Sequence, residues 1–233
     1  MKKLMGFLFI TLFPIFIFAK ELEITDLNMN LNVNDNDIIL SIDKLENNKD
    51  LEKLGISKET MENIMIKNNI YLDIIKADAS YEILVIVPQT NVSIGNLTKK
   101  DDVFIENLRQ EVVGETGAEI SSIYKNNYKF IMVDYYDKDT GYYAVNYYTV
   151  VNSKGYNFQL QKRSKITDSD KFDLKEIVDS VKFKVIEEKK EEIKEEKKEF
   201  NYMNLVYGAI LGLMAGVITY YIGITIKRLK QGR

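Results

Sequence analysis

An uncharged apolar run near the C-terminus limits what this chain can fold into more than any other feature. Residues 205–226 contain no Asp, Glu, Lys or Arg. An α-helix rises about 1.5 Å per residue, so this run spans about 33 Å, enough for the hydrocarbon core of a bilayer. Tyr202 and Tyr207 lie near its upstream boundary, where amphipathic rings favour the membrane interface. We predict a single transmembrane helix over residues 203–226.

The two ends of the chain predict the same orientation for this helix. Residues 227–233 form a basic tail, which the positive-inside rule places in the cytoplasm. Residues 1–19 show two lysines, an apolar stretch and then Ala19, the pattern of a secretory signal peptide cleaved after Ala19. An uncleaved signal anchor is the alternative. We therefore expect the intervening chain on the outer side of a plasma membrane.

A highly charged segment separates the predicted membrane helix from the rest of the chain. Residues 186–202 include "EEKKEEIKEEKKEF", without glycine or proline. Glu187 with Lys190 and Glu191 with Lys194 are favourable pairs on a helix, but the repeat also places like charges four apart. We interpret this segment as a solvated stalk. A partner-binding role is the alternative, although a helix that is polar all round has no face to bury.

Composition excludes several classes of function. The 233-residue chain has no cysteine and no histidine, which rules out disulfides, thiolate or imidazole metal sites and nucleophiles activated by histidine. Its net charge is −3, with lysines mixed among acidic residues, so no basic surface for nucleic acid is expected. We expect no cofactor, and we expect a protein that is not an enzyme.

Residues 20–185 are expected to form one extracytoplasmic domain, in which strands and helices alternate. The hydrophobic pattern predicts seven strands, at residues 21–33, 37–43, 70–76, 81–89, 129–136, 142–151 and 156–164. The "NDND" turn separates the first two strands, and the last three form an antiparallel meander. Such a mixture is typical of an α+β domain, with helices packed on an antiparallel sheet.

Four helices are expected between these strands. A short helix ends at Gly55, and Ser57 caps a second. A third falls within residues 98–118, and the last begins near residues 167–169. The side chains expected to face the core from the last three helices are Met61, Ile64 and Met65; Ile105, Leu108 and Val112; and Phe172, Ile177, Val178 and Val181.

A family resemblance rests on four stretches of this domain: "LEKLGISKETMENIMIKNNIYLDIIKADASYEILVIV", "YKFIMVDYY", "NYYTVVNSKGYNFQL" and "LKEIVDSVKF". They resemble uncharacterised secreted or membrane-anchored proteins of low-GC Gram-positive bacteria with a PsbP-like domain. The resemblance covers about residues 22–185 and implies an antiparallel sheet sandwiched by helices. It brings no catalytic motif. Since the better-known members of this fold bind other macromolecules, the resemblance implies a binding or scaffolding role.

Tyrosines are concentrated on one predicted hairpin, within residues 135–148. Adjacent residues of a strand point to opposite faces, so each Tyr-Tyr pair is expected to place one ring inward and one outward. Tyr136, Tyr143 and Tyr147 are our candidates for an outward aromatic platform that binds a glycan, a peptide or a partner protein. Cross-strand aromatic pairs that only stabilise the sheet are the alternative.

The turn of the same hairpin is rich in acidic residues. Asp134, Asp137 and Asp139 lie close together and would offer carboxylate oxygens to Ca²⁺. The spacing does not fit an EF-hand, because the twelfth position counted from Asp137 is Tyr148. Aspartate and glycine are also what a hairpin turn requires, so we favour the turn and predict no metal site.

Two further hypotheses concern catalysis and assembly. Without histidine or cysteine, a hydrolase would need serine with lysine or paired carboxylates, and the chain offers only sequence proximity: Ser121 and Ser122 near Lys125, or Glu106 with Glu111. In the predicted membrane helix, Gly208, Gly212 and Gly216 share one face, which suggests a homodimer or a partner helix. Glycine is also simply common in membrane helices.

The sequence therefore predicts a single-pass bacterial membrane protein whose outer domain binds an unknown protein or a cell-wall polymer. An accessory subunit that contacts a membrane complex through the transmembrane helix is the alternative function, followed by the carboxylate or serine hydrolase.

Overall fold

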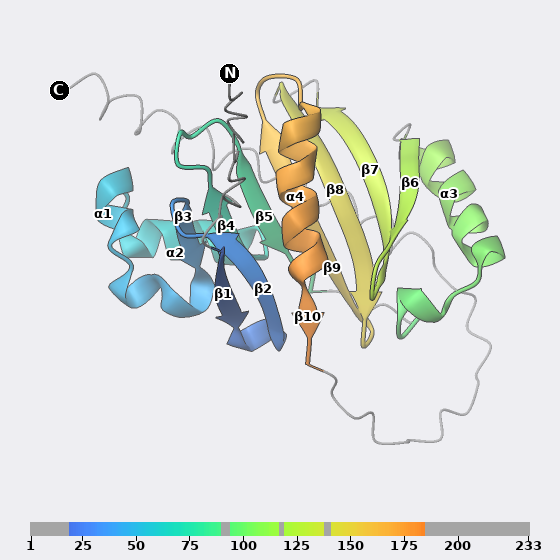
Figure 1. The fold of residues 1–233 in the computed structure, drawn as a ribbon, viewed down its shortest axis with the longest axis horizontal. Helices are drawn as coiled ribbons and strands as arrows, with labels where there is room; N and C mark the ends of the chain where they lie inside the picture. Colours follow the sequence, from blue (N-terminus) through green and yellow to red (C-terminus); the bar gives the residue numbers. More distant parts are fainter. Residues whose placement is uncertain (1–18, 90–93, 117–118, 138–140, 185–233) are drawn as a thin grey trace, which may run out of the picture.

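The computed structural model describes residues 19–89, 94–116, 119–137 and 141–184 (Figure 1). The predicted signal peptide up to residue 18, the stalk, the transmembrane helix with its three glycines and the basic tail all lie outside these residues. Within the described ranges, no helix combines the length and the apolar character that crossing a membrane requires.

The central element is a seven-stranded sheet in which every neighbouring pair is antiparallel. Its strands, in spatial order, are β3 (Ile38–Ser41), β4 (Ile70–Ile75), β5 (Glu82–Ile86), β9 (Lys154–Lys162), β8 (Tyr142–Val151), β7 (Lys129–Asp137) and β6 (Glu119–Lys125). The predicted hairpin of β4 with β5 and the meander of β7, β8 and β9 are confirmed. Strand β6 was not predicted.

A second, three-stranded sheet corrects the prediction for residues 21–33. Instead of one long strand, β1 (Ala19–Ile24) and β2 (Met29–Asn34) form an antiparallel hairpin around the 3₁₀ turn η1 (Thr25–Leu27). Asn28 makes the reversal with a left-handed backbone, φ 49°, which asparagine tolerates well. The third strand, β10 (Lys182–Phe183), pairs with β2 from the far end of the domain.

The helices begin and end where local chemistry satisfies their free backbone groups. The Ser57 side chain accepts a hydrogen bond from the Thr60 amide, and Thr167 forms a capping box with Asp170. The helices are α1 (Asp50–Leu54), α2 (Lys58–Lys67), α3 (Asp102–Thr116) and α4 (Asp168–Ser180), with 3₁₀ segments η2 (Ile42–Asn47) and η3 (Leu97–Lys99).

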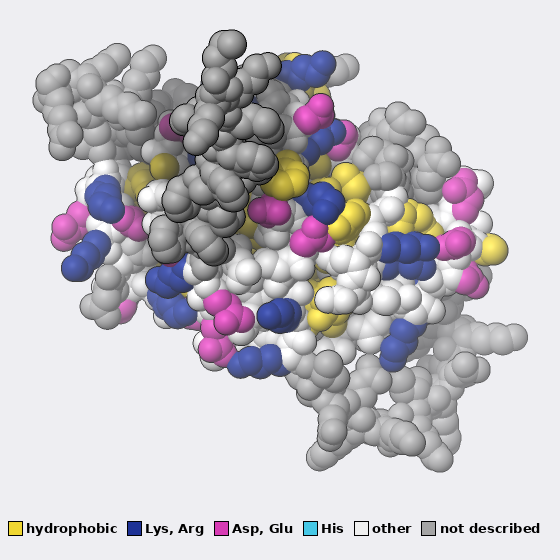
Figure 2. Space-filling view, in the orientation of Figure 1, with side chains coloured by type: hydrophobic (Ala, Val, Ile, Leu, Met, Phe, Trp, Pro, Cys, Tyr) yellow, Lys and Arg dark blue, Asp and Glu magenta, His cyan; other side chains and the backbone are white. Residues whose placement is uncertain are grey.

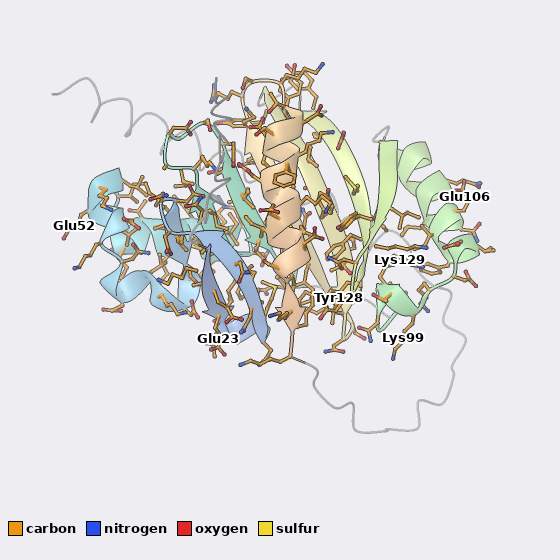
Figure 3. The ribbon with its side chains drawn as sticks, in the orientation of Figure 1. Glu23, Glu52, Lys99, Glu106, Tyr128 and Lys129 are labelled. Carbon is orange, nitrogen blue, oxygen red and sulfur yellow. The ribbon has the colours of Figure 1, made fainter. Side chains whose placement is uncertain are left out.

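One face of the large sheet is covered by α4 and the small sheet (Figure 1). Aromatic rings fill this layer: Phe130 lies edge-on to both Tyr147 and Phe158, with ring centroids 6.2 and 6.1 Å apart. At the end of the sheet next to β10, Tyr128 stacks edge-on to Phe183 with centroids 5.0 Å apart (Figure 3). These contacts join the C-terminal strand to the main core.

The opposite face carries two separate apolar clusters. One includes Leu54, Met65 and Leu84 and packs under α1 and α2. The other includes Leu108, Val133 and Tyr148 and packs under η3 and α3. Helices therefore lie on both faces of the sheet, and the expectation of an α+β fold made of antiparallel sheet and helices is confirmed.

One core prediction for α4 was wrong. Phe172 is 55% exposed, whereas Ile177, Val178 and Val181 are buried as predicted. Leu174, two residues further along, takes the inward position at 0% exposure. The apolar stripe of this helix is thus narrower than the hydrophobic pattern indicated. The side chain of Val112 lies outside the description.

Candidate binding surface

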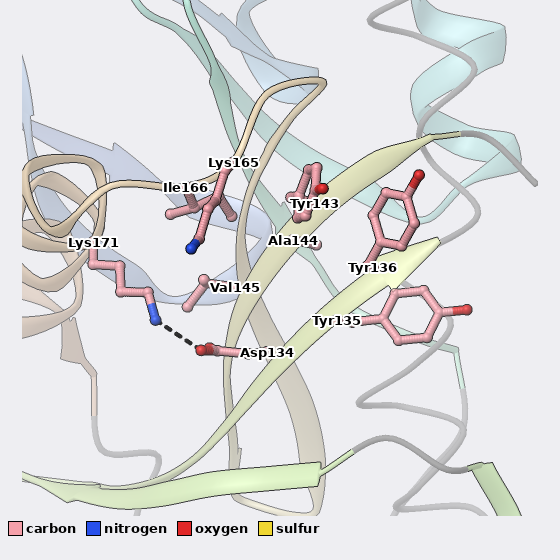
Figure 4. Close-up of a pocket in the computed structure, with 9 residues that line it drawn as sticks. All are labelled: Asp134, Tyr135, Tyr136, Tyr143, Ala144, Val145, Lys165, Ile166 and Lys171. Carbon is pink, nitrogen blue, oxygen red and sulfur yellow. Dashed lines mark hydrogen bonds and ion pairs between the residues drawn. The ribbon is translucent and has the colours of Figure 1, made fainter. Parts of the chain in front are cut away.

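A hollow of about 300 Å³ lies where the end of β7, the start of β8 and the loop before α4 meet (Figure 4). It brings together residues about thirty positions apart in the chain. Nine residues line it: Asp134, Tyr135, Tyr136, Tyr143, Ala144, Val145, Lys165, Ile166 and Lys171. The turn that joins β7 to β8, at residues 138–140, is outside the description.

Tyr136 and Tyr143 form an aromatic pair at this hollow. The two residues are direct partners across β7 and β8, so their side chains lie on the same face of the sheet. Their ring centroids are 4.5 Å apart and the rings are tilted by 34°. Tyr136 is 45% exposed and Tyr143 is partly buried, which leaves an aromatic surface open to solvent.

Tyr147 shares the face of this pair but is not on the surface. It is 3% exposed, contrary to the outward position predicted for it. Its ring meets Tyr124 edge-on, with centroids 5.7 Å apart, and it belongs to the core layer under α4. Burial raises the pKa of its hydroxyl. Strand alternation places the three rings on one face, but it does not tell where a helix covers that face.

Charged groups flank the aromatic pair on the side of α4. Lys171 donates to Asp134 at 2.7 Å, which ties α4 to β7 (Figure 4). Lys165 is exposed, and no described residue forms an ion pair with it. Ile166 packs against the core cluster next to it. Figure 2 shows lysine and acidic side chains interspersed on this side of the molecule, around hydrophobic patches.

A buried ion pair lies next to the hollow, on the strand beside Tyr143. Lys162, on β9, donates to Asp170 of α4 at 2.7 Å, and the two side chains are 9% and 12% exposed. Burial opposes ionisation of Asp170, but hydrogen bonds from Lys162 and Thr167 outweigh it and lower the pKa of the carboxyl. This pair fixes the first turn of α4, and with it Lys171, against the sheet.

The acidic residues of the hairpin do not assemble a metal site in the part that the structure describes. Asp134 accepts from Lys171, while Asp137 lies at the end of β7, where its backbone pairs with Tyr142. The side chain of Asp137 and the whole of Asp139 are outside the description. Across the described ranges, there is no group of three or more Asp, Glu, His or Cys residues suited to a metal ion.

The residues proposed for a hydrolase are not brought into a described site. Lys125 lies 3.5 Å from Asp102, in an exposed ion pair. Glu106 is exposed on α3, and its carboxylate is 3.5 Å from the amide nitrogen of Gln110 (Figure 3). The side chains of Ser121, Ser122 and Glu111 lie outside the description.

Sequence reasoning missed two groups of residues. The first is the lysines beside the aromatic pair; a signal was present, because Lys165 and Lys171 flank the predicted start of the last helix. The second is a pair of buried carboxylates, Asp73 and Glu82, at 1% and 0% exposure. The sequence did carry a sign of these buried carboxylates, because each of the strands "IYLDII" and "EILVI" has one acidic residue and is otherwise almost entirely apolar.

Comparison with known proteins yields structural neighbours only. The sequence matches no protein-family profile and no curated protein. The fold is similar to the solution structure of the cyanobacterial PsbP protein, CyanoP, from Synechocystis sp. PCC 6803, with a TM-score of 0.42 and 10% identity over 71% of this chain and 92% of the other. It is also similar to a protein of Bacteroides thetaiotaomicron VPI-5482, with a TM-score of 0.38 and 8% identity over 68% of this chain and 46% of the other. Neither likeness carries a function to this chain.

Proposed function

We propose that this chain is a membrane-anchored binding module of the bacterial cell surface, and that it acts without catalysis. The proposal includes the topology expected from the sequence: a signal peptide, an outer domain, a charged stalk and one transmembrane helix. It also includes membership of the PsbP-like proteins of low-GC Gram-positive bacteria that the domain resembles. The observation that carries it is the exposed ring pair of Tyr136 and Tyr143 beside the hollow before α4.

The chemistry of the hollow favours an anionic polymer of the cell wall. Tyrosine rings offer flat apolar surface together with hydroxyl groups, a combination suited to sugar rings and to partner side chains. Lys165 is exposed beside the rings and has no described ionic partner, so it is available to a phosphate or carboxylate of the ligand. Lys171 is near enough to line the same hollow, although it already pairs with Asp134.

Sedimentation with isolated cell walls tests this proposal. Full-length protein in detergent is mixed with walls, and with walls stripped of their anionic polymers by acid. We expect cosedimentation with intact walls only. We expect the double variant Tyr136→Ala/Tyr143→Ala to lose at least about tenfold in affinity, since aromatic anchors dominate such surfaces. Lys165→Glu should weaken binding further as salt is lowered, because repulsion is then less screened.

Two matched controls separate the hollow from general surface effects. Phe172→Ala removes another exposed aromatic ring, at 55% exposure, that does not line the hollow. Lys67→Glu reverses an exposed lysine at the end of α2. Both should bind walls like the wild type. Equal binding by the tyrosine variant and the wild type would refute the assignment of this surface.

An accessory subunit of a membrane complex is the second candidate function, favoured by Gly208, Gly212 and Gly216 in the predicted membrane helix. In vivo crosslinking with and without residues 203–233 distinguishes the two. Capture that persists without the helix supports recognition by the outer domain. Capture that requires the helix, and that is lost when the three glycines become leucine, supports the subunit function or a homodimer.

A further inference from the structure

A row of polar side chains crosses the middle of the sheet face that carries α1, α2 and α3. Asp73 is on β4, Glu82 on β5, and Gln159 and Gln161 on β9. All four are between 0% and 1% exposed. Buried side chains of this kind are uncommon in a sheet core, where polar groups have to be paired to offset their loss of water.

The strand register places these four side chains on one face. Asp73 lies opposite Leu84, and Leu84 lies opposite Gln159. Glu82 lies opposite Gln161 and diagonally next to Asp73, because residues 82 and 84 share a face. Neighbouring strands are about 4.8 Å apart, so Glu82 has Asp73 diagonally next to it on one side and Gln159 diagonally next to it on the other, while Asp73 and Gln159 are two strands apart with Leu84 between them.

Hydrogen bonds link part of the row, but some of its acceptor oxygens receive no hydrogen bond from the described residues. Gln159 donates to Gln161 at 2.7 Å, and Gln161 donates in turn to Glu82. Both carboxylate oxygens of Asp73 are buried and accept no hydrogen bond from the described residues. The side-chain oxygen of Gln159 is also buried and without a donor there. The atoms left without partners at Asp73 and Gln159 are therefore oxygens, and they call for a positively charged or donating group.

Asp73 and Glu82 are two acidic groups close together in a buried place, and a cation is the ligand that suits such a pair. Burial raises the pKa of Asp73 well above its usual range, and the negative charge of Glu82 raises it further. Among the described residues, no lysine or arginine shifts the pKa of Asp73 itself. Lys162 directly follows Gln161 in β9, but its side chain lies on the other face of the sheet, where it pairs with Asp170. A bound cation would let both carboxylates ionise without repulsion.

We propose that Asp73 and Glu82, with the side-chain oxygen of Gln159, form a binding site for a hard divalent cation, Ca²⁺ or Mg²⁺. Such ions take carboxylate and amide oxygens as ligands, and they complete their coordination with water. Two carboxylates neutralise one divalent ion. The site is separate from the hairpin aspartates and from the hollow of the aromatic pair, because it lies on the opposite face of the sheet.

Thermal unfolding of the full-length protein in detergent tests the proposal. Protein stripped with a chelator is heated alone, with CaCl₂, with MgCl₂, and with NaCl at matched ionic strength. A ligand that binds only the folded state stabilises it, so we expect the Tm to rise by at least about 5 °C at a cation concentration one hundred times Kd. Titration calorimetry should give one site per chain.

Three variants assign the cation to this row. Asp73→Asn and, separately, Glu82→Gln should abolish the cation-dependent shift, whatever each does to the Tm without cation. Asp137→Asn/Asp139→Asn, in the hairpin, should keep the shift. The proposal is overturned if neither cation shifts the wild type, if the shift survives in both single variants, or if only the hairpin variant loses it. The calorimetric stoichiometry of the wild type remains decisive if a variant does not fold.

Discussion

The two faces of the seven-stranded sheet bury their residues in different ways. On the face under α4, most buried polar groups pair across the layer: Lys162 binds Asp170 at 2.7 Å, the Thr149 hydroxyl donates to a backbone carbonyl at 2.8 Å, and only one carboxylate oxygen of Asp134 is buried there without a described partner. On the opposite face, Asp73 and Gln159 retain buried oxygens without a described donor. The first face is built for stability. The second gives up stability at its centre, which is the behaviour expected where a sheet keeps polar groups for a ligand.

Removing a ring from the α4 face should have the largest effect. Phe158 is 0% exposed and packs against Phe130, so Phe158→Ala loses apolar burial and leaves a cavity. We expect the free energy of unfolding to fall by about 4 kcal/mol, measured by urea denaturation. Phe172→Ala, which removes a ring that is 55% exposed, should change it by less than about 0.5 kcal/mol. Similar values for the two would contradict the core position of Phe158.

Breaking the ion pair between the sheet and α4 should come next. Lys162→Met keeps the apolar stem but leaves the Asp170 carboxylate, which is 12% exposed, without its partner. We expect a loss of about 3 kcal/mol at pH 7. Because the pKa of Asp170 is lowered in the folded state, the pair stabilises the fold above the unfolded pKa of 3.8, and that contribution is lost as the pH falls through the folded pKa. The variant and the wild type should therefore converge in stability in acid.

Overpacking the opposite face should cost less. A Cβ added at Gly155 would come within 3.1 Å of Cζ of Tyr148 and closer still to its hydroxyl, so this glycine makes room for a fully buried ring. We expect Gly155→Ala to destabilise the fold by about 2 kcal/mol in urea denaturation. Combining it with Tyr148→Phe, which removes the hydroxyl, should recover part of the loss. No recovery would mean that contact with the ring carbons of Tyr148, rather than with its hydroxyl, sets the cost.

Neutralising the polar row should have the smallest effect and the opposite sign. With divalent cations chelated, Asp73→Asn should stabilise the protein at pH 7.5 by about 1 kcal/mol, because it removes a buried carboxylate without a described partner. The folded pKa of Asp73 is raised above 3.8, so wild-type stability falls as the pH rises from 3.8 to the folded pKa and then stays low. The gain should therefore be larger at pH 7.5 than at pH 4.5.

The sequence predicted elements whose pattern is local and missed those that depend on covering layers. Ser57 and Thr167 were readable as helix starts because their side chains act within one turn. The hairpin at Asn28 was missed because residues 21–33 contain no glycine or proline to mark the reversal; the one signal was the break in alternation at Thr25 and Asp26.

The candidate site shows the same limit. Alternation correctly grouped Tyr136, Tyr143 and Tyr147 on one face, but only the position of α4 decides that Tyr147 is buried while Tyr136 is exposed. Lys165 and Lys171 join the tyrosines from about thirty residues away, a distance that no local pattern spans. Asp73 and Glu82 were visible as acids in apolar strands, yet their proximity depends on the register of β4 with β5.

The pairing of β10 with β2 has a consequence for how the chain is made. Lys182 and Phe183 complete the small sheet next to Asn30 and Met29, and α4 immediately before them covers the aromatic layer. Synthesis proceeds from the N-terminus, so the rings of Phe130 and Phe158 remain without their cover until residues 168–183 have left the ribosome. The nascent domain therefore leaves this aromatic layer uncovered until late in translation, and chaperones have to protect it until then.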